Sequence, residues 1–175
     1  IRCGHKGQVG QVGSVPSVMD VLAAIEHSAF AEWVRTSQSL WAYPGVLFLH
    51  TVGLAIVAGI STMVNLRLLG FARTLPIAPI EKFFPIVWAG FWINAVSGAV
   101  LFAQDATTKA TNPAFVLKMI LIALAVAGMV SLRRVVASHP DANTPVSGWG
   151  RFLAAATLVL WFGAITAGRL MIYVG

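Results

Sequence analysis

Three basic side chains lie at similar depths within separate apolar segments of this 175-residue chain. His50 and Lys118 lie near the start of their segments, and Arg169 lies near the end of another. At a rise of about 1.5 Å per residue in a helix, all three would sit roughly 6–8 Å below the same membrane surface. Polar groups inside a membrane are costly, so their shared depth predicts a common pocket.

The residue types in this pocket indicate what it could bind. His50 could ligate a metal or haem iron, or carry protons. Lys118 and Arg169 could pair with propionates, a quinone oxygen or another anion. With only Asp105 nearby as a counter-charge, the cluster favours an acidic ligand. The structural alternative is that Lys118 and Arg169 extend to lipid head groups while His50 bonds a backbone carbonyl.

Further polar residues share helical faces with this cluster. Ser61 and Asn65 lie on nearly the same face as His50, at about 100° per residue. Asn94 and Gly98 share a face in the next apolar segment, where small residues allow helices to approach closely. We therefore expect a bundle whose interior is polar toward its outer side.

Four apolar segments would position these residues. They cover approximately residues 45–66, 84–102, 114–132 and 152–173. Each is near the roughly 20 residues that span a bilayer core. Since backbone groups in lipid must bond internally, these segments should be helices. The sequence thus predicts an all-α integral membrane protein, with a four-transmembrane-helix bundle over residues 41–175.

The composition agrees with a membrane protein. The chain is 58% hydrophobic and only 10% charged, whereas soluble domains carry about 25% charged residues. Its net charge of +6 comes from 12 basic and 6 acidic residues. We interpret the basic residues as topology signals and contacts to membrane lipids, and expect no nucleic-acid binding because no recognition motif accompanies them. Cys3 is the single cysteine, and no CxxCH motif for covalent haem attachment is present.

The segment before the first span has a different pattern. Residues 18–40 alternate apolar and charged side chains, which favours an N-terminal amphipathic interfacial helix. A solvated helix packed on the bundle is the alternative. His27 lies in this segment and could approach the pocket as a second axial ligand, or could simply be interfacial. Residues 1–17 are predicted to be a flexible tail, and could be foreign to the functional protein.

The distribution of Lys and Arg predicts an orientation. The basic residues near the loop after span one are Arg67, Arg73 and Lys82; those near the loop after span three are Arg133, Arg134 and Arg151. The connection between spans two and three holds only Lys109. By the positive-inside rule, the two richer loops should be cytoplasmic. Both termini would then face outward, away from the cytoplasm.

Several short motifs resemble a family of bacterial membrane proteins of unknown function. They are Trp41-Ala42-Tyr43-Pro44, His50, Asn65-Leu66-Arg67-Leu68-Leu69-Gly70, Asn112-Pro113-Ala114-Phe115 with Lys118, and Ala167-Gly168-Arg169. The resemblance covers about residues 20–175.

A first-span His with a third-span Lys is also distantly similar to HemJ-type protoporphyrinogen oxidases and to the CopD-like copper-resistance membrane domain. In the HemJ-type proteins such a pair serves a haem or porphyrin site, which implies that role for His50 and Lys118. Those families carry more histidines than the spans here. A bis-histidine haem would therefore need His27, or the haem would be five-coordinate, and a copper site would be short of ligands.

These observations favour a haem- or porphyrin-binding membrane protein, with haem b as cofactor and electron transfer or tetrapyrrole chemistry as its role. His50 would ligate the iron, and Lys118 and Arg169 would hold the propionates. Two alternatives are a non-catalytic accessory subunit of a larger membrane complex, and a carrier or sensor for a small anion or quinone. The chain has no GxSxG, HExxH, P-loop or GxGxxG motif, and acidic residues are nearly absent from the spans, so a conventional hydrolase is not expected.

Overall fold

The computed structural model describes residues 16–71, 82–137 and 146–174, and its regular elements there are all helices. The four long ones are α3 (Tyr43–Leu69), α4 (Phe84–Ala103), α6 (Pro113–Ala137) and α7 (Gly148–Val174). Each is long and apolar enough to cross a membrane. The predicted all-α, four-helix membrane bundle is confirmed.

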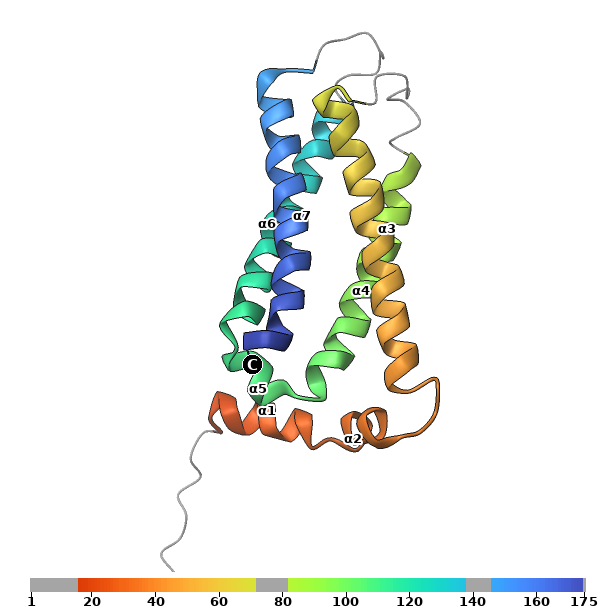
Figure 1. Cartoon of the computed structure of the whole chain (residues 1–175), viewed down its shortest axis with the longest axis vertical. Helices are drawn as coiled ribbons and strands as arrows, with labels where there is room; N and C mark the ends of the chain where they lie inside the picture. The colour runs from red at the N-terminus through yellow and green to blue at the C-terminus, as the bar shows by residue number, and fades with distance from the viewer. Residues whose placement is uncertain (1–15, 72–81, 138–145, 175) are drawn as a thin grey trace, which may run out of the picture.

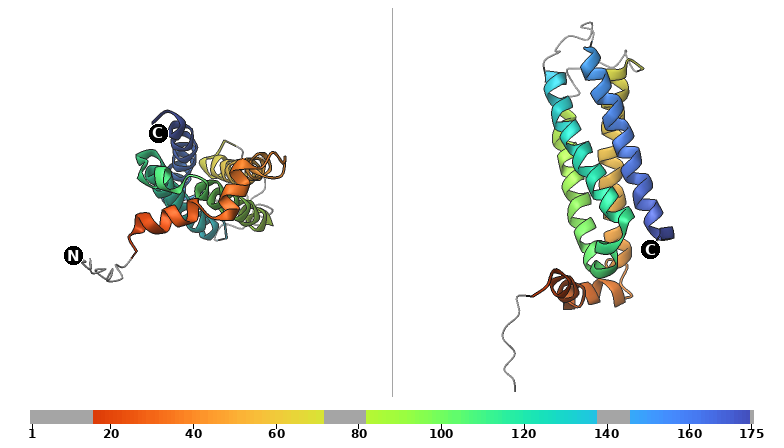
Figure 2. Two further views of the ribbon diagram at one scale, coloured as in Figure 1. Left: turned by 90° about the horizontal axis from the view of Figure 1, so that it is seen from below. Right: turned by 90° about the vertical axis from the view of Figure 1, so that its left-hand side faces the viewer.

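The long helices form two packed pairs. α3 packs along α4, α6 packs along α7, and the pairs meet mainly where α3 contacts α7 (Figures 1 and 2). Three short helices, α1 (Val18–Glu26), α2 (Ala29–Thr36) and α5 (Ala106–Thr111), lie together at one end of the bundle. The C-terminus of α7 lies near this same end of the bundle (Figure 1), because four spans return the chain to the side from which it entered.

The helix ends follow local chemistry. Pro44 and Pro85 occupy the first positions of α3 and α4, where a missing N–H is harmless. α3 ends at Gly70, whose φ of 96° is a left-handed conformation that favours glycine. Asn112 precedes α6, and its side-chain oxygen accepts a hydrogen bond from the Ala114 N–H at 2.8 Å.

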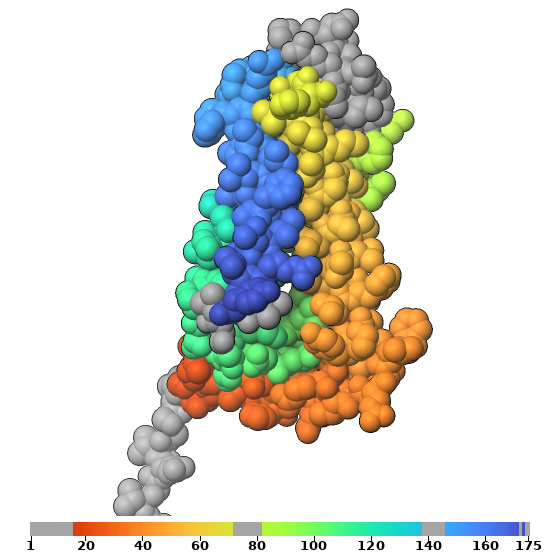
Figure 3. All heavy atoms as spheres, viewed as in Figure 1, coloured from red at the N-terminus to blue at the C-terminus, as the bar shows by residue number. Residues whose placement is uncertain are grey.

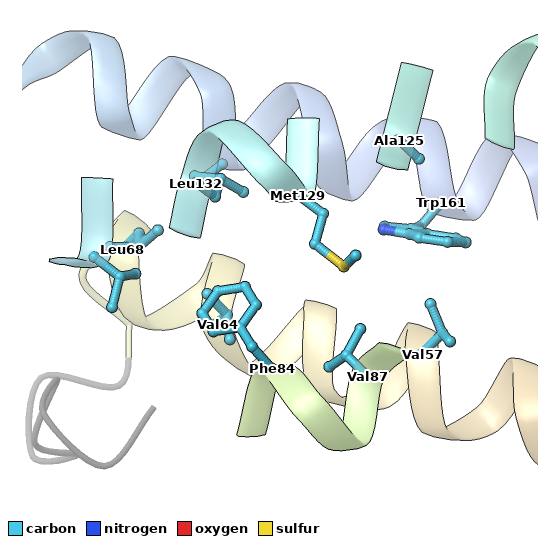
Figure 4. Packing of buried hydrophobic residues seen from close by; sticks show 11 residues of the cluster. Val57, Val64, Leu68, Phe84, Val87, Ala125, Met129, Leu132 and Trp161 are labelled. Carbon is cyan, nitrogen blue, oxygen red and sulfur yellow. The ribbon is translucent and has the colours of Figure 1, made fainter. Parts of the chain in front are cut away.

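The apolar core lies in the half of the bundle remote from α1 and α2. It includes Val57 and Leu68 of α3, Met129 of α6 and Trp161 of α7, all at most 5% exposed. Figure 4 shows these side chains converging from both helix pairs. Many other large apolar side chains of the spans are exposed, as expected where lipid is the solvent.

Glycines set the distance between the paired helices. A Cβ at Gly53 of α3 would lie 2.7 Å from the main-chain nitrogen of Asn94, and one at Gly90 of α4 would lie 2.7 Å from Ile56. Neither site has space for a side chain. Small residues thus allow α3 and α4 to pack nearly backbone to backbone.

The helix expected over residues 18–40 is two helices. Ser28 separates them, because its side-chain oxygen accepts from the Ala31 N–H and starts α2. Both helices are held to the bundle: the Glu26 carboxylate accepts hydrogen bonds from the N–H and hydroxyl of Thr107, and Arg35 donates to a main-chain oxygen of the α4–α5 turn.

The outer surface of α1 and α2 carries large apolar side chains. Val18, Phe30, Trp33 and Trp41, which follows α2, are all at least half exposed. Such a surface suits an interfacial position, which stays a prediction. Residues 1–15 of the expected tail lie outside the described part of the chain.

A candidate ligand-binding cleft

The three basic residues singled out from the sequence line a single cleft. His50 of α3, Lys118 of α6 and Arg169 of α7 surround a space of about 420 Å³ near the end of the bundle that carries α1, α2 and α5. Its volume lies within the roughly 300–1,000 Å³ typical of small-molecule sites. The other described lining residues are Leu47, Thr51, Leu54, Val57, Phe91, Asn94, Ile122, Trp161, Ala164, Ile165 and Gly168.

One ring nitrogen of His50 is fully occupied by α4. Nδ1 lies 3.0 Å from the main-chain oxygen of Asn94 and 3.2 Å from Ser97 Oγ. A carbonyl oxygen can only accept, and Ser97 already donates its hydroxyl proton to the Ile93 carbonyl at 2.6 Å. Nδ1 therefore carries the proton and donates. Nε2 is left as an acceptor, and no described residue hydrogen-bonds to it.

Asn94 and Gly98 fix the position of this imidazole. Asn94 Nδ2 donates to the main-chain oxygen of His50 at 2.8 Å. It also lies 3.3 Å from His50 Nδ1, but that contact joins two donors and is not a hydrogen bond in this tautomer. On the other side, a Cβ at Gly98 would stand 3.0 Å from His50 Cε1. The ring thus occupies a slot on α4 that the absence of a side chain creates.

The two cations of the cleft come from α6 and α7. The Lys118 side chain runs past Gly168, so that Nζ would be 3.6 Å from a Cβ at that position. Arg169 follows Gly168 directly and is exposed, whereas Lys118 is half-buried. None of the described lining residues carries a carboxylate. Positive charge is therefore left for a ligand to neutralise.

The remaining walls of the cleft are apolar, and the cleft is open on one side. Phe91 and Trp161 provide aromatic surface from α4 and α7. Figure 3 shows a hollow between the N-terminal half of α3 and the C-terminal part of α7. A ligand with an apolar body and an acidic edge would match these walls.

Some residues expected at the site lie elsewhere. His27 follows the end of α1 and is exposed, and it is not among the lining residues. Asp105 starts α5 at the turn after α4. Ser61 and Asn65 line a separate, smaller cavity near the opposite end of α3. The expected single polar stripe on α3 is thus divided, because a helix of this length passes from one cavity to the other.

Other residues of the site were not singled out from the sequence. Ser97 follows Asn94 by three positions, a spacing that places both on one helical face and could have revealed it. Phe91 carries no such signal, and for Trp161 the sequence favours a packing role, because aromatic residues inside a span more often serve packing.

The donor set limits the kinds of metal site. Among the described residues, no group of three or more His, Cys, Asp or Glu side chains could hold a metal ion. Haem iron needs only an axial ligand from the protein, since the porphyrin supplies four nitrogens.

Comparison of the chain with protein-family models, with curated proteins and with solved structures finds no match in any of the three.

Proposed function

We propose that this membrane protein binds haem b, or a related acidic porphyrin, in the cleft between its two helix pairs. The observation that carries the proposal is the convergence of His50, Lys118 and Arg169 on one cleft without a carboxylate among its described lining residues. The proposal also rests on the distant resemblance to haem-binding membrane domains noted from the sequence.

The state of His50 suits an iron ligand. Haem-ligating histidines usually donate one ring N–H to a carbonyl, which fixes the ring and leaves the other nitrogen for the metal. His50 has this arrangement, with Nδ1 held by Asn94 and Nε2 directed to no described partner. His27 is outside the cleft, so we propose a five-coordinate site with His50 as the single protein ligand.

The other lining residues would contact different parts of the haem. Lys118 and Arg169 would pair with the two propionates, while Phe91 and Trp161 would cover the apolar macrocycle and exclude water. A bound haem supplies one-electron redox chemistry, which suits electron transfer.

Absorbance spectra of the detergent-purified protein test this proposal. We expect a Soret band in the oxidised protein, and α and β bands after reduction. His50→Ala should lose these bands, whereas His27→Ala, a matched histidine outside the cleft, should keep them. A featureless visible spectrum after haem supplementation would refute the proposal and favour the accessory-subunit hypothesis, for which stoichiometric co-purification of partners is the test.

One observation favours the carrier or sensor for a quinone as a second candidate. An apolar groove of about 350 Å³ adjoins the cleft on the outer face of α3 and α7, and shares Trp161 and Ile165 with it. Such a groove would accommodate an isoprenoid tail while a quinone oxygen accepts a hydrogen bond from Lys118. Quinone-dependent thermal stabilisation that Lys118→Ala abolishes, in protein without a Soret band, would select this candidate.

We place the protein in the inner membrane of a bacterium, with the end that holds α1, α2 and α5 toward the periplasm. The bacterial membrane rests on the family resemblance noted from the sequence, and the orientation rests on the excess of Lys and Arg near the opposite ends of the spans.

A further inference from the structure

A second, much smaller cavity lies in the half of the bundle remote from the cleft. Here it is called the inner cavity, and it is defined by Ser61, Asn65, Thr157 and the surrounding apolar side chains of Phe84, Met129 and Leu132. Its volume is about 10 Å³, which is about the space that one water molecule requires. Figure 4 shows Met129, Leu132 and Phe84 directed toward one another in this region.

Two polar side chains in the inner cavity have no hydrogen-bond partner among the described residues. Asn65 and Thr157 are each 1% exposed, and neither the amide atoms of Asn65 nor the hydroxyl of Thr157 has one. Buried polar groups are almost always paired, with protein or with ordered water. Two unpaired side chains lining one cavity therefore point to a bound polar molecule.

The size and chemistry of the inner cavity select water as that molecule. Buried waters typically make about three hydrogen bonds. Asn65 offers both a donor and an acceptor, Thr157 offers a hydroxyl, and the Ser61 hydroxyl, which donates to the Met129 sulfur, retains lone pairs. A cation would meet few oxygen ligands here and no described carboxylate, and burying an uncompensated charge is far more costly than burying a neutral water.

We propose that one ordered water molecule occupies the inner cavity and bridges Asn65 of α3 to Thr157 of α7. It accepts a hydrogen bond from one of these side chains and donates to the other and to Ser61. The bridge joins the two helix pairs at the end where α3 and α7 meet, while the same helices separate around the cleft at the other end. This inference does not depend on which ligand the cleft binds.

Radiolytic hydroxyl-radical labelling detects the water directly. Met129 lines the inner cavity and is 5% exposed, so only a radical formed from adjacent water would oxidise it rapidly. We expect fast Met129 oxidation in the intact protein in detergent, retained in Thr157→Ser and lost in the Asn65→Leu/Thr157→Val double variant. Absence of fast oxidation in the wild type, or undiminished oxidation in the double variant, would overturn the proposal.

The single variant Thr157→Val gives a second test, because the sign of its change in unfolding temperature differs between a hydrated and a dry cavity. Valine has the shape of threonine without the hydroxyl. If water bridges the pair, the substitution removes one partner and should lower the unfolding temperature by about 2–4 °C. In a dry cavity, it would remove an unpaired buried hydroxyl and raise that temperature, which would refute the bridge. Thr166→Val is the matched control, because Thr166 on the same helix is exposed and its hydroxyl bonds the Phe162 carbonyl.

Discussion

The imidazole of His50 lies against Gly98 so closely that a side chain at position 98 would stand 3.0 Å from Cε1. The two residues belong to different helices, α3 and α4, whose spacing is set by glycines that meet backbone to backbone. The direction of the free nitrogen of His50 is therefore decided by how these two helices pack.

Gly98→Val should weaken haem binding although the iron ligand remains. The added side chain would displace the imidazole, and overpacking of this kind costs about 1–3 kcal/mol, which corresponds to about fivefold to a hundredfold in affinity. Titration of the haem-free protein with haemin measures the effect. Ala99→Val is the matched control, because Ala99 is exposed on the same helix. Equal affinity in both variants would show that Gly98 does not position His50.

Lys118→Met should weaken haem binding more than Arg169→Met. Lys118 is half-buried whereas Arg169 is exposed, and a hydrogen bond to a charged group contributes about 1.5–3 kcal/mol, most where water is excluded. The loss expected for Lys118→Met is thus about tenfold to a hundredfold in affinity. Lys82→Met removes an exposed cation at the opposite end and should have no effect. If Lys118→Met behaved like this control, the propionate role would be excluded.

Gly128→Val should destabilise the α6–α7 pair. A Cβ at Gly128 would overlap the Thr157 hydroxyl, so the helices would have to separate at a cost of about 1–3 kcal/mol. Reversible unfolding in detergent measures this change in the free energy of unfolding. Ala127→Val, at an exposed neighbouring position, provides the comparison. Equal stability of the two variants would contradict the close contact.

Attachment of α1 to the bundle should depend on pH through Glu26. Hydrogen bonds from the Thr107 N–H and hydroxyl lower the pKa of the Glu26 carboxyl below its ordinary 4.5. Because the folded-state pKa is depressed, the contact is fully present above pH 4.5 and is lost as the pH falls through the lowered value.

A spin-label distance from Met19→Cys on α1 to Thr108→Cys on α5, with Cys3→Ser, reports this attachment. We expect a narrow distribution at neutral pH, broadening in acid, and broadening at neutral pH in Glu26→Gln. Glu32→Gln should change nothing, since that side chain is exposed on α2. A distribution unaffected by Glu26→Gln would show that other contacts hold α1.

The orientation is testable with two exposed positions at opposite ends of the bundle. In a Cys3→Ser background, Thr108→Cys on α5 should react with an impermeant maleimide in intact cells, and Ser147→Cys before α7 should react only after permeabilisation. The reverse pattern would invert the proposed topology.

The sequence by itself determined the membrane class, the four spans and the common depth of His50, Lys118 and Arg169. These follow from local quantities: the length of an apolar run, the 1.5 Å rise of a helix and the prolines and glycines at its ends. The span boundaries therefore shifted by only a few residues between expectation and structure.

The tertiary structure decided which polar residues share a cavity. Helical angle places Ser61 and Asn65 on the face of His50, but distance along α3 and the packing of α7 put them in another cavity. The hydrogen bonds that join His50 to Ser97 and Thr107 to Glu26 likewise depend on partners distant in the chain. The helical period determines on which face of its own helix a residue lies. The residues that this face contacts are determined only by the packing between helices.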